Sequence, residues 1–288
     1  MSANPTIVLV HGAASTAGVW APLQRELALR GVRSLAPDLP GHGLNAHHPP
    51  SYYQSPQDLA AFATAPSALA GIGIDDYVEH LAGLLRRVAE HGPVLLAGTS
   101  AGGIPITAVA ERYPELVDRL VYLSAWCAVR SESVADSASW PEHTGNLLDG
   151  VGWPVLGDPA RLGVLRFNLR DADPARFRAA KAAMLAEGTD DEFRALVDVL
   201  EPDANVRIAG ERVPATAERW GRVPRTFVRF TADRCTPLPE QDRMIAEADA
   251  LAPGNPFDVR TLDCGHVAYF CRPVEFADLL TGPAADLG

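Results

Sequence analysis

Lysine is almost missing from this chain of 288 residues. Lys181 is the one lysine among 25 basic side chains, and the others are all arginine. Schiff-base chemistry, Ser–Lys catalysis and pyridoxal phosphate binding all depend on a lysine amine. Lys181 lies in an alanine-rich segment with the pattern of an exposed helix. The sequence therefore gives no support to a lysine-based mechanism.

Cysteine is scarce as well. A disulfide framework is typical of short chains dense in cysteine, and zinc sites typically pair their cysteines as Cys-x-x-Cys. Neither pattern occurs, and His47-His48 has no other ligand-type residue at metal spacing. Residues 1–5 also lack the basic start of a signal peptide. We expect reduced thiols, no metal, no other cofactor and a cytoplasmic location. The four cysteines are Cys127, Cys235, Cys264 and Cys271.

Positive charge does not cluster in the sequence. The formal net charge is −11, and the arginines are scattered along the chain. Nucleic-acid binding needs a basic patch that neutralises phosphates, so we expect no nucleic-acid partner. Residues 92–110 carry no charge and approach the length of a membrane span, but glycine and proline interrupt them. We interpret this stretch as a buried strand, a turn and a helix, and expect no membrane partner.

Short apolar runs alternate with segments of helical periodicity along most of the chain. Strands buried on both faces and joined by helices are typical of a parallel sheet. The pattern therefore predicts an α/β fold with a mostly parallel, doubly wound sheet. The expected strands are 6–10, 32–36, 94–97, 120–123, 226–230 and 257–262, and the expected helices are 19–30, 75–91, 102–113 and 239–250.

This alternation stops between residues 124 and 222. Helical patterns occur near 174–186 and 190–200, and no convincing strand is present. We interpret residues 124–222 as a helical cap inserted into a core formed by residues 1–123 and 223–288. The segment 45–73 also looks irregular.

Gly98-Thr99-Ser100-Ala101-Gly102 lies between an expected strand and an expected helix. This is the context required of the Gly-x-Ser-x-Gly turn that presents a nucleophilic serine. Glycines flank such a serine because the turn is sharp, and neighbouring Cβ atoms would clash. Ser100 is therefore the candidate nucleophile.

A serine hydroxyl needs a base to take its proton and an acid to orient that base. Asp233 follows a late strand and His266 follows the next one, which gives the order Ser, Asp, His. Backbone N–H groups of Ala13 and Ala101 are the candidates for an oxyanion hole, because they follow the first strand and the nucleophile.

These assignments have alternatives. Asp233 is also suited to capping the turn before Thr236, and Asp263 competes with it as the acid. Asp263 belongs to the end of the same strand as His266 and is expected to point elsewhere. His42, between two glycines, is interpreted as a structural loop residue. The cysteines beside His266 are interpreted as packing residues.

Over nearly its whole length the chain resembles α/β-hydrolases, which implies an α/β-hydrolase fold with an inserted cap. It also resembles, more narrowly, the branch that contains plant methylesterases and hydroxynitrile lyases. That branch implies cofactor-free chemistry on small esters or cyanohydrins. The similar segments are Val8–Ala13, Trp20, Leu120–Ala125, Cys264–His266, Pro273 and Leu279-Leu280.

The chain also departs from that branch. Gly98-Thr99-Ser100 replaces the more usual Gly-His-Ser, and the loop between residues 43 and 75 is longer than expected. The lyases that it resembles have a threonine and a lysine where this chain has Gly12 and Val267. The resemblance therefore favours an esterase, because no lysine follows His266 to stabilise a departing cyanide.

We interpret the protein as a serine hydrolase that cleaves a small to medium, apolar or aromatic carboxylic ester through an acyl-enzyme on Ser100. The same residues would also serve an acyl-transfer or cyclising enzyme, a hydroxynitrile lyase or a non-catalytic ligand-binding homologue. We expect a small-molecule ester as the partner. The predicted pocket residues are Gly12, Trp126, Tyr52 and Tyr53.

Overall fold

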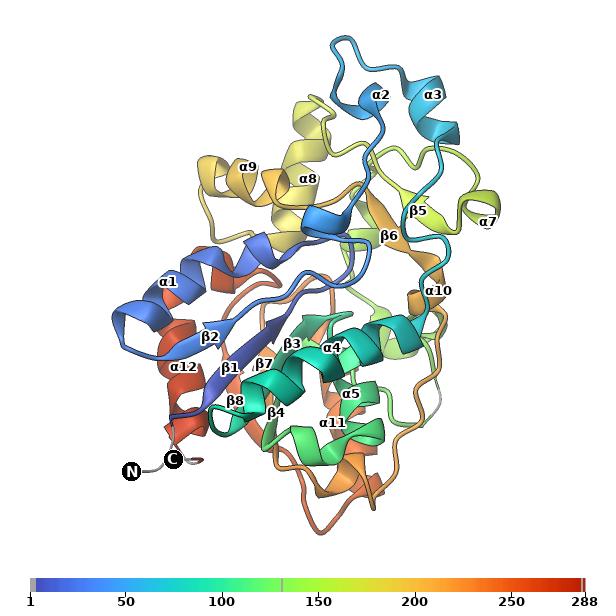
Figure 1. Ribbon diagram of the computed structural model, residues 1–288. Helices are drawn as coiled ribbons and strands as arrows, with labels where there is room; N and C mark the ends of the chain where they lie inside the picture. Colours follow the sequence, from blue (N-terminus) through green and yellow to red (C-terminus); the bar gives the residue numbers. More distant parts are fainter. Residues whose placement is uncertain (1–3, 131, 286, 288) are drawn as a thin grey trace.

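The computed structural model of the chain, which describes residues 4–130, 132–285 and 287, is built on a six-stranded sheet (Figure 1). The strand order is β2-β1-β3-β4-β7-β8, and every neighbouring pair is parallel. The predicted fold class is confirmed. The strands are β1 (Thr6–Val10), β2 (Arg33–Leu35), β3 (Val94–Ser100), β4 (Arg119–Ala125), β7 (Arg225–Phe230) and β8 (Asp258–Leu262).

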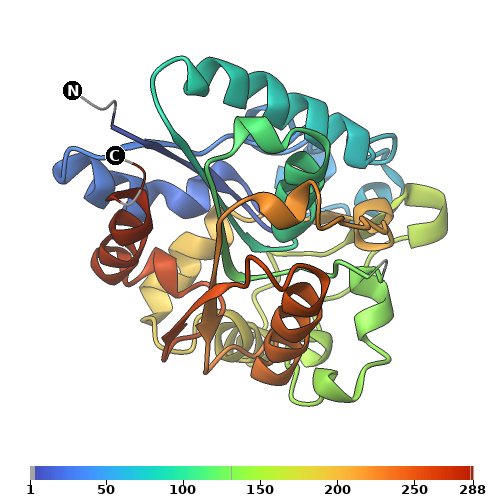
Figure 2. The same ribbon diagram turned by 90° about the horizontal axis from the view of Figure 1, so that it is seen from below.

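Helices cover both faces of this sheet (Figures 1 and 2). Side chains alternate along a strand, so Ile7 and Leu9 of β1 pack on one face while Val8 and Val10 pack on the other. The first face is covered by α1 (Ala21–Leu29) and α12 (Pro273–Ala285). The second is covered by α4 (Ile74–Ala89), α5 (Gly103–Arg112) and α11 (Leu238–Leu251).

Between β4 and β7 the chain leaves the sheet and forms a separate layer above one end of it (Figure 1). The helices of this cap are α6 (Val134–Ser137), α7 (Pro159–Leu162), α8 (Pro174–Met184), α9 (Asp190–Asp198) and α10 (Val206–Ala209). Local signals explain the two longest. Asp173 caps α8, which has proline in its first turn, and Thr189 with Glu192 forms a capping box on α9.

The prediction that the cap contains no strand was wrong. β5 (Val164–Arg166) and β6 (Asp203–Asn205) form a two-stranded antiparallel sheet. Three residues are too few to show the period of two by which a strand is recognised in a sequence. The partner strands are also far apart in the chain.

The segment 45–73 is not irregular either, because it contains α2 (Pro50–Tyr53) and α3 (Leu59–Thr64). It packs against the cap beside β5 (Figure 1). The buried Arg166 of β5 joins the two parts: it forms two hydrogen bonds with Asp203, both 2.7 Å long, and donates to the carbonyl oxygens of Phe62 and Ala65. A guanidinium that is paired with a carboxylate and hydrogen-bonded to backbone carbonyls is the form in which a buried charge is tolerated.

Short 3-10 turns connect several of these elements. They are η1 (Ala17–Trp20), η2 (Gly43–Asn45), η3 (Pro114–Leu116), η4 (Pro141–His143), η5 (Leu148–Gly150), η6 (Trp220–Arg222) and η7 (Ala268–Phe270). Among the described residues, no helix has the length and apolar character needed to cross a membrane.

Candidate active site

The predicted catalytic residues all lie at the carboxyl edge of the sheet. Ser100 is the last residue of β3, Asp233 follows the end of β7, and His266 follows the end of β8. In a parallel sheet the carboxyl ends of the strands meet at one edge, where ligands typically bind. The cap lies over this edge (Figure 1).

Ser100 has the strained backbone of a nucleophile turn. Its φ angle is +52°, a left-handed conformation that non-glycine residues seldom adopt. Glycine is required on both sides of it: a Cβ on Gly98 would lie 2.8 Å from the carbonyl oxygen of Gly102, and a Cβ on Gly102 would lie 2.6 Å from that of His11. The N–H of Trp126 donates to the Ser100 carbonyl oxygen at 2.8 Å, which holds the turn against β4.

His266 and Asp233 form a buried pair. The Nδ1 atom of His266 lies 2.7 Å from Oδ2 of Asp233. The other carboxylate oxygen, Oδ1, accepts the backbone N–H groups of Cys235 and Thr236 at 2.7 and 2.9 Å. A carboxylate fixed in this way holds the imidazole with its proton on Nδ1, so Nε2 remains unprotonated and able to accept a proton.

Ser124 is a member of the site that sequence analysis missed. Its buried hydroxyl donates to Oδ2 of Asp233 at 2.6 Å, on the oxygen that also contacts His266. Ser124 has a φ angle of +42°, and its neighbour Ala125 is paired with Ser100 across β3 and β4. One strand end therefore supports both the serine and the aspartate. The sequence did offer one signal for Ser124: it is a polar residue directly after an apolar run that was expected to form a buried strand.

Asp263, the competing acid, contacts a different part of the molecule. Its Oδ1 atom accepts the hydroxyl of Thr231 at 2.8 Å in an exposed position. The hydrogen bond of His266 goes to Asp233 instead. The geometry thus favours Asp233 as the residue that orients the imidazole.

The loop after β1 runs beside Ser100. A Cβ on Gly12 would lie 2.9 Å from the Cβ of Ser100, so a side chain at position 12 would collide with the serine. Ala14 has a φ angle of +49°, and its carbonyl oxygen accepts the N–H of Glu201 at 2.9 Å. Ala13 is thereby held between the serine and the cap.

His11 is a structural part of this loop. Its Nδ1 atom lies 2.9 Å from the carbonyl oxygen of Gly12, and its Nε2 atom accepts the N–H of Leu39 at 3.1 Å. Burial, helped by the neighbouring His42, lowers the pKa of His11 to about 3. His11 is therefore neutral, and both of its nitrogens are already committed.

A mostly apolar cavity opens between this loop and the cap. It has about 70 Å³ of room for the centres of water-sized molecules, and a single water needs about 10–15 Å³ on that measure. It can therefore accept a small organic group next to the proposed oxyanion hole. The lining residues are His11, Gly12, Ala13, Leu39, His42, Tyr77, Ala101, Val134, Asn205, Ile208 and Ala209.

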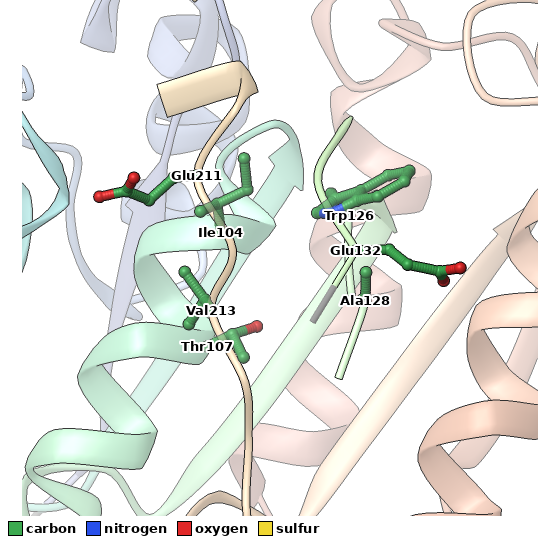
Figure 3. Close-up of a pocket in the computed structure, with 7 residues that line it drawn as sticks. All are labelled: Ile104, Thr107, Trp126, Ala128, Glu132, Glu211 and Val213. Atoms are coloured by element: carbon green, nitrogen blue, oxygen red, sulfur yellow. The ribbon is translucent and has the colours of Figure 1, made fainter. Parts of the chain in front are cut away.

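Three of the predicted pocket residues are absent from this lining. Trp126 stacks on Trp140, with ring centroids 5.3 Å apart, and faces a second, smaller pocket beside Ile104 and Glu132 (Figure 3). Tyr52 and Tyr53 lie beneath the guanidinium of Arg170, as part of the contact between segment 45–73 and the cap. The predicted Gly12 does line the cavity.

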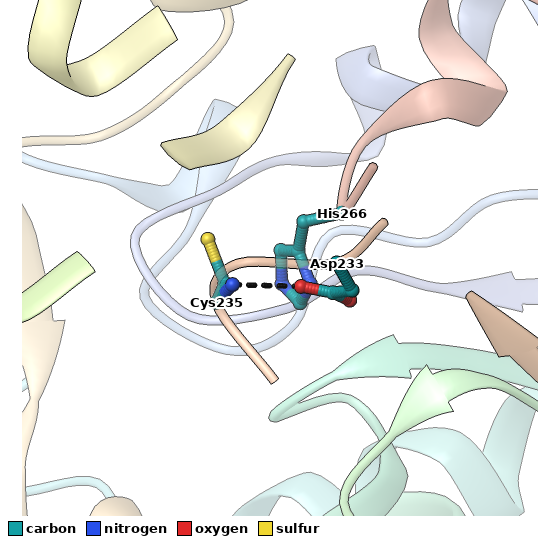
Figure 4. Close-up of side chains that lie close together, drawn as sticks. All are labelled: Asp233, Cys235 and His266. Carbon is teal, nitrogen blue, oxygen red and sulfur yellow. Dashed lines mark hydrogen bonds and ion pairs between the residues drawn. The ribbon is translucent and has the colours of Figure 1, made fainter. Parts of the chain in front are cut away.

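Asp233, Cys235 and His266 bring ligand-type atoms within 4.8 Å of one another (Figure 4). A metal would need the thiolate of Cys235. Burial and the nearby Asp233 raise the pKa of that thiol well above its ordinary value, and Sγ donates to the carbonyl oxygen of Ala183 at 3.3 Å. Both oxygens of Asp233 already accept hydrogen bonds. Asp233, Cys235 and His266 therefore fit a site for proton transfer better than a metal site.

Glu201, where the cap meets the core, is a buried acid that predicts a pH dependence of stability. Burial, with smaller contributions from Asp38 and Asp203, raises the pKa of Glu201 from 4.5 to about 8. Its Oε1 atom accepts the N–H of Gly43 at 2.6 Å and lies 4.0 Å from Nε2 of His48. Since the unfolded chain loses this proton first, the free energy of unfolding is expected to fall as the pH rises from about 4.5 to about 8.

We expect Glu201→Gln to remove this loss, because the amide oxygen can still accept the Gly43 N–H and carries no charge. At pH 8.5 the variant should have a Tm at least about 2 °C higher than the wild type, a shift that about 1 kcal/mol produces in a chain of this size. At pH 4, below both pKa values, the two should agree within about 1 °C, because about 0.5 kcal/mol or less then separates them. Thermal unfolding followed by circular dichroism measures both, with the exposed Glu90→Gln as control. A lower Tm for Glu201→Gln at pH 8.5 would contradict the prediction.

A strained serine after β3 and a His–Asp pair after β7 and β8, all on a parallel sheet, form the arrangement of an α/β-hydrolase. Comparison with known families agrees with this class. The model of the alpha/beta hydrolase family matches residues 7–279, and the chain therefore belongs to that family.

Similar proteins include ester hydrolases. The chain is 22% identical to Methylesterase 17 of Arabidopsis thaliana, over 99% of this chain and 93% of the relative. It is 24% identical to the Pyrethroid hydrolase of Sphingobium wenxiniae, over 95% of this chain and 85% of the relative. It is also 24% identical to the Alpha-hydroxynitrile lyase of Arabidopsis thaliana, over 97% and 96% of the two chains.

Solved structures show the same fold. The crystal structure of polyneuridine aldehyde esterase superimposes with a TM-score of 0.69 at 20% identity, covering 98% of this chain and 99% of that one. The resemblance to plant methylesterases and their relatives that the sequence indicated is confirmed.

Proposed function

We propose that this protein is a serine hydrolase that cleaves an uncharged carboxylic ester of small to medium size, with an apolar or aromatic body. The observation that carries this proposal is the buried hydrogen bond between His266 and Asp233, next to a serine held at a φ angle of +52°. The methylesterase and pyrethroid hydrolase among its relatives support ester hydrolysis as the reaction.

In the proposed mechanism, Ser100 Oγ attacks the ester carbonyl while Nε2 of His266 takes the hydroxyl proton. The N–H groups of Ala13 and Ala101 stabilise the negative charge that develops on the carbonyl oxygen. His266 then gives the proton to the departing alcohol, which leaves an acyl group on Ser100. Water attacks this acyl-enzyme in the reverse sequence and releases the acid.

Asp233 keeps the imidazole in the required tautomer and stabilises the transient imidazolium. Ser124 and two backbone N–H groups hold Asp233 in turn. No step needs a cofactor. The four free cysteines are consistent with our further proposal that the protein works in the reducing cytoplasm.

Intact-mass measurement tests the acyl-enzyme directly. The protein is incubated with a panel of aryl, methyl and lactone esters and quenched in acid within seconds. We expect a mass increase equal to the acyl group in the wild type, located at Ser100 by peptide mapping, and none in Ser100→Ala. An adduct on another residue, or turnover without any adduct on Ser100 under conditions of rapid quenching, would overturn the proposal.

The same measurement separates the alternatives when alcohols, amines and mandelonitrile are added to the panel. An acyl-transfer or cyclising enzyme would form the adduct but release it to an alcohol or amine faster than to water. A hydroxynitrile lyase would release cyanide from mandelonitrile without any adduct. A ligand-binding homologue would show neither product.

A further inference from the structure

The cavity beside the proposed oxyanion hole contains no charged side chain among its described lining residues. Its two histidines are neutral, because burial lowers the pKa of both His11 and His42. A charged substrate group placed there would lose its hydration without gaining a partner of opposite charge. The part of the substrate that enters this cavity is therefore uncharged.

Four polar side chains interrupt the apolar lining, and three of them are occupied. His11 uses both ring nitrogens in hydrogen bonds to backbone groups. Asn205 donates to the carbonyl oxygens of Leu69 and Ile72, and its Oδ1 atom caps the start of α10. The hydroxyl of Tyr77 interacts with the side chain of Asn205, which partly offsets the rise in the Tyr77 pKa caused by burial.

His42 is the fourth, and among the described residues no partner forms a hydrogen bond of 3.5 Å or less with its Nε2 atom. Its Nδ1 atom lies 3.2 Å from the carbonyl oxygen of Pro40, and a carbonyl oxygen can only accept, so Nδ1 carries the proton. In the neutral ring Nε2 is then an acceptor. The ring is fixed by its neighbours, with its centroid 4.9 Å from that of His11 and 6.1 Å from that of Tyr77.

We propose that His42 determines substrate specificity by accepting a hydrogen bond from a hydroxyl group on the substrate, so that the preferred substrates are esters with an uncharged, largely apolar body that carries one hydroxyl. The inference rests on the proposed ester hydrolysis. It goes beyond it, because it names a chemical class and a residue outside the proposed catalytic set. It also assigns His42 a role beyond that of a structural loop residue.

We expect a hydroxylated ester to have a higher kcat/KM than its parent, because the parent has no donor for Nε2 of His42. A neutral acceptor in an apolar cavity that loses its water must find a donor, and an analogue without the hydroxyl leaves it unpaired. The wild type should therefore prefer a hydroxylated ester over its parent by about 5- to 10-fold in kcat/KM. The difference should lie mainly in KM, because a hydroxyl that takes no part in the reaction contributes equally to the binding of substrate and transition state.

Matched ester pairs test this expectation. The methyl esters of 2-hydroxybutanoic, 3-hydroxybutanoic and 4-hydroxyphenylacetic acid are each compared with the parent ester, so that the hydroxyl is sampled at several distances from the carbonyl. We expect at least one pair to show the preference in the wild type. His42→Phe, which keeps a flat ring and removes the acceptor, should reduce that preference to about one. His42→Gln, which retains an acceptor oxygen, should keep part of it.

Two further measurements make the result unambiguous. His47→Phe removes an exposed histidine of the same segment and should leave the preference unchanged. Binding of each pair to Ser100→Ala and to Ser100→Ala/His42→Phe, followed by NMR titration, reports recognition without hydrolysis. A loss of hydrolysis with retained binding preference would reject the proposed reaction and keep the role of His42. Equal binding of every pair to Ser100→Ala, or an undiminished preference in folded His42→Phe, would overturn the role of His42.

Discussion

Ser100→Ala is expected to lower kcat for ester hydrolysis by at least about 10³-fold, because the members of a catalytic triad act as a unit and the remaining rate comes from binding and the oxyanion hole alone. The variant should fold normally. Alanine fits the turn no worse than serine, since both have a Cβ at the position whose φ angle is +52°. Initial rates with a chromogenic aryl ester, with circular dichroism as the check on folding, measure the effect.

Ser139→Ala provides a matched control, because Ser139 is an exposed serine whose hydroxyl contacts only its local turn. Its rate should lie within about twofold of the wild type, since a surface substitution of this kind changes the stability by less than about 0.5 kcal/mol. If a folded Ser100→Ala protein kept more than about a tenth of the wild-type rate, Ser100 would not be the nucleophile. The histidine–aspartate pair would then need another partner.

Much of the sheet could be predicted because its strands are buried on both faces. Residues 7–10 form an unbroken apolar run, and such runs bounded by turn residues indicate strands of a parallel sheet. The ends of these strands then locate the site, because parallel strands present their carboxyl ends at one edge. Ser100, Asp233 and His266 could be found in this way without any knowledge of contacts.

The contacts that complete the site are not local, and the sequence does not show them. Ser124 and Asp233 are 109 residues apart in the chain, and only the pairing of β4 with β7 brings the two strand ends together. The same holds for Arg166, which joins the cap to segment 45–73 through residues about 100 positions away. Such partners depend on how the cap folds back onto the core.

The pocket was predicted from aromatic residues, and the structure places their side chains outside the lining of the cavity beside the proposed oxyanion hole. Trp126 and Tyr52 bury their rings against other side chains of the protein, in a stack with Trp140 and beneath Arg170. Aromatic side chains stabilise cores and pockets alike, so their presence near a site does not decide between the two. The place of His42 in the cavity wall could not be predicted, because a histidine between glycines in a loop has no signal that distinguishes a cavity wall from a turn.

Asp233→Asn carries the second large expected effect, and its cause can be derived from four hydrogen bonds. Oδ1 accepts two backbone N–H groups, and Oδ2 accepts the Ser124 hydroxyl and Nδ1–H of His266. Asparagine has a single acceptor oxygen, so its NH₂ group must face one of these two pairs of donors. The backbone N–H groups cannot change, whereas a hydroxyl can rotate and an imidazole can move its proton.

The NH₂ group will therefore occupy the position of Oδ2 and force the proton of His266 from Nδ1 to Nε2. An imidazole in that tautomer cannot take the proton of Ser100, so we expect kcat to fall by at least about 10³-fold while KM changes little. Asp263→Asn is the matched control, because Asp263 accepts the hydroxyl of Thr231 in an exposed position. The rate of this variant should stay within about twofold of the wild type, since exposed contacts of this kind contribute at most about 0.5 kcal/mol. Kinetics of both variants decide between the two acids, and the ring nitrogen shifts of His266 in ¹⁵N NMR spectra report the tautomer. A large loss in Asp263→Asn, or an unchanged tautomer in Asp233→Asn, would show that Asp233 does not orient the base.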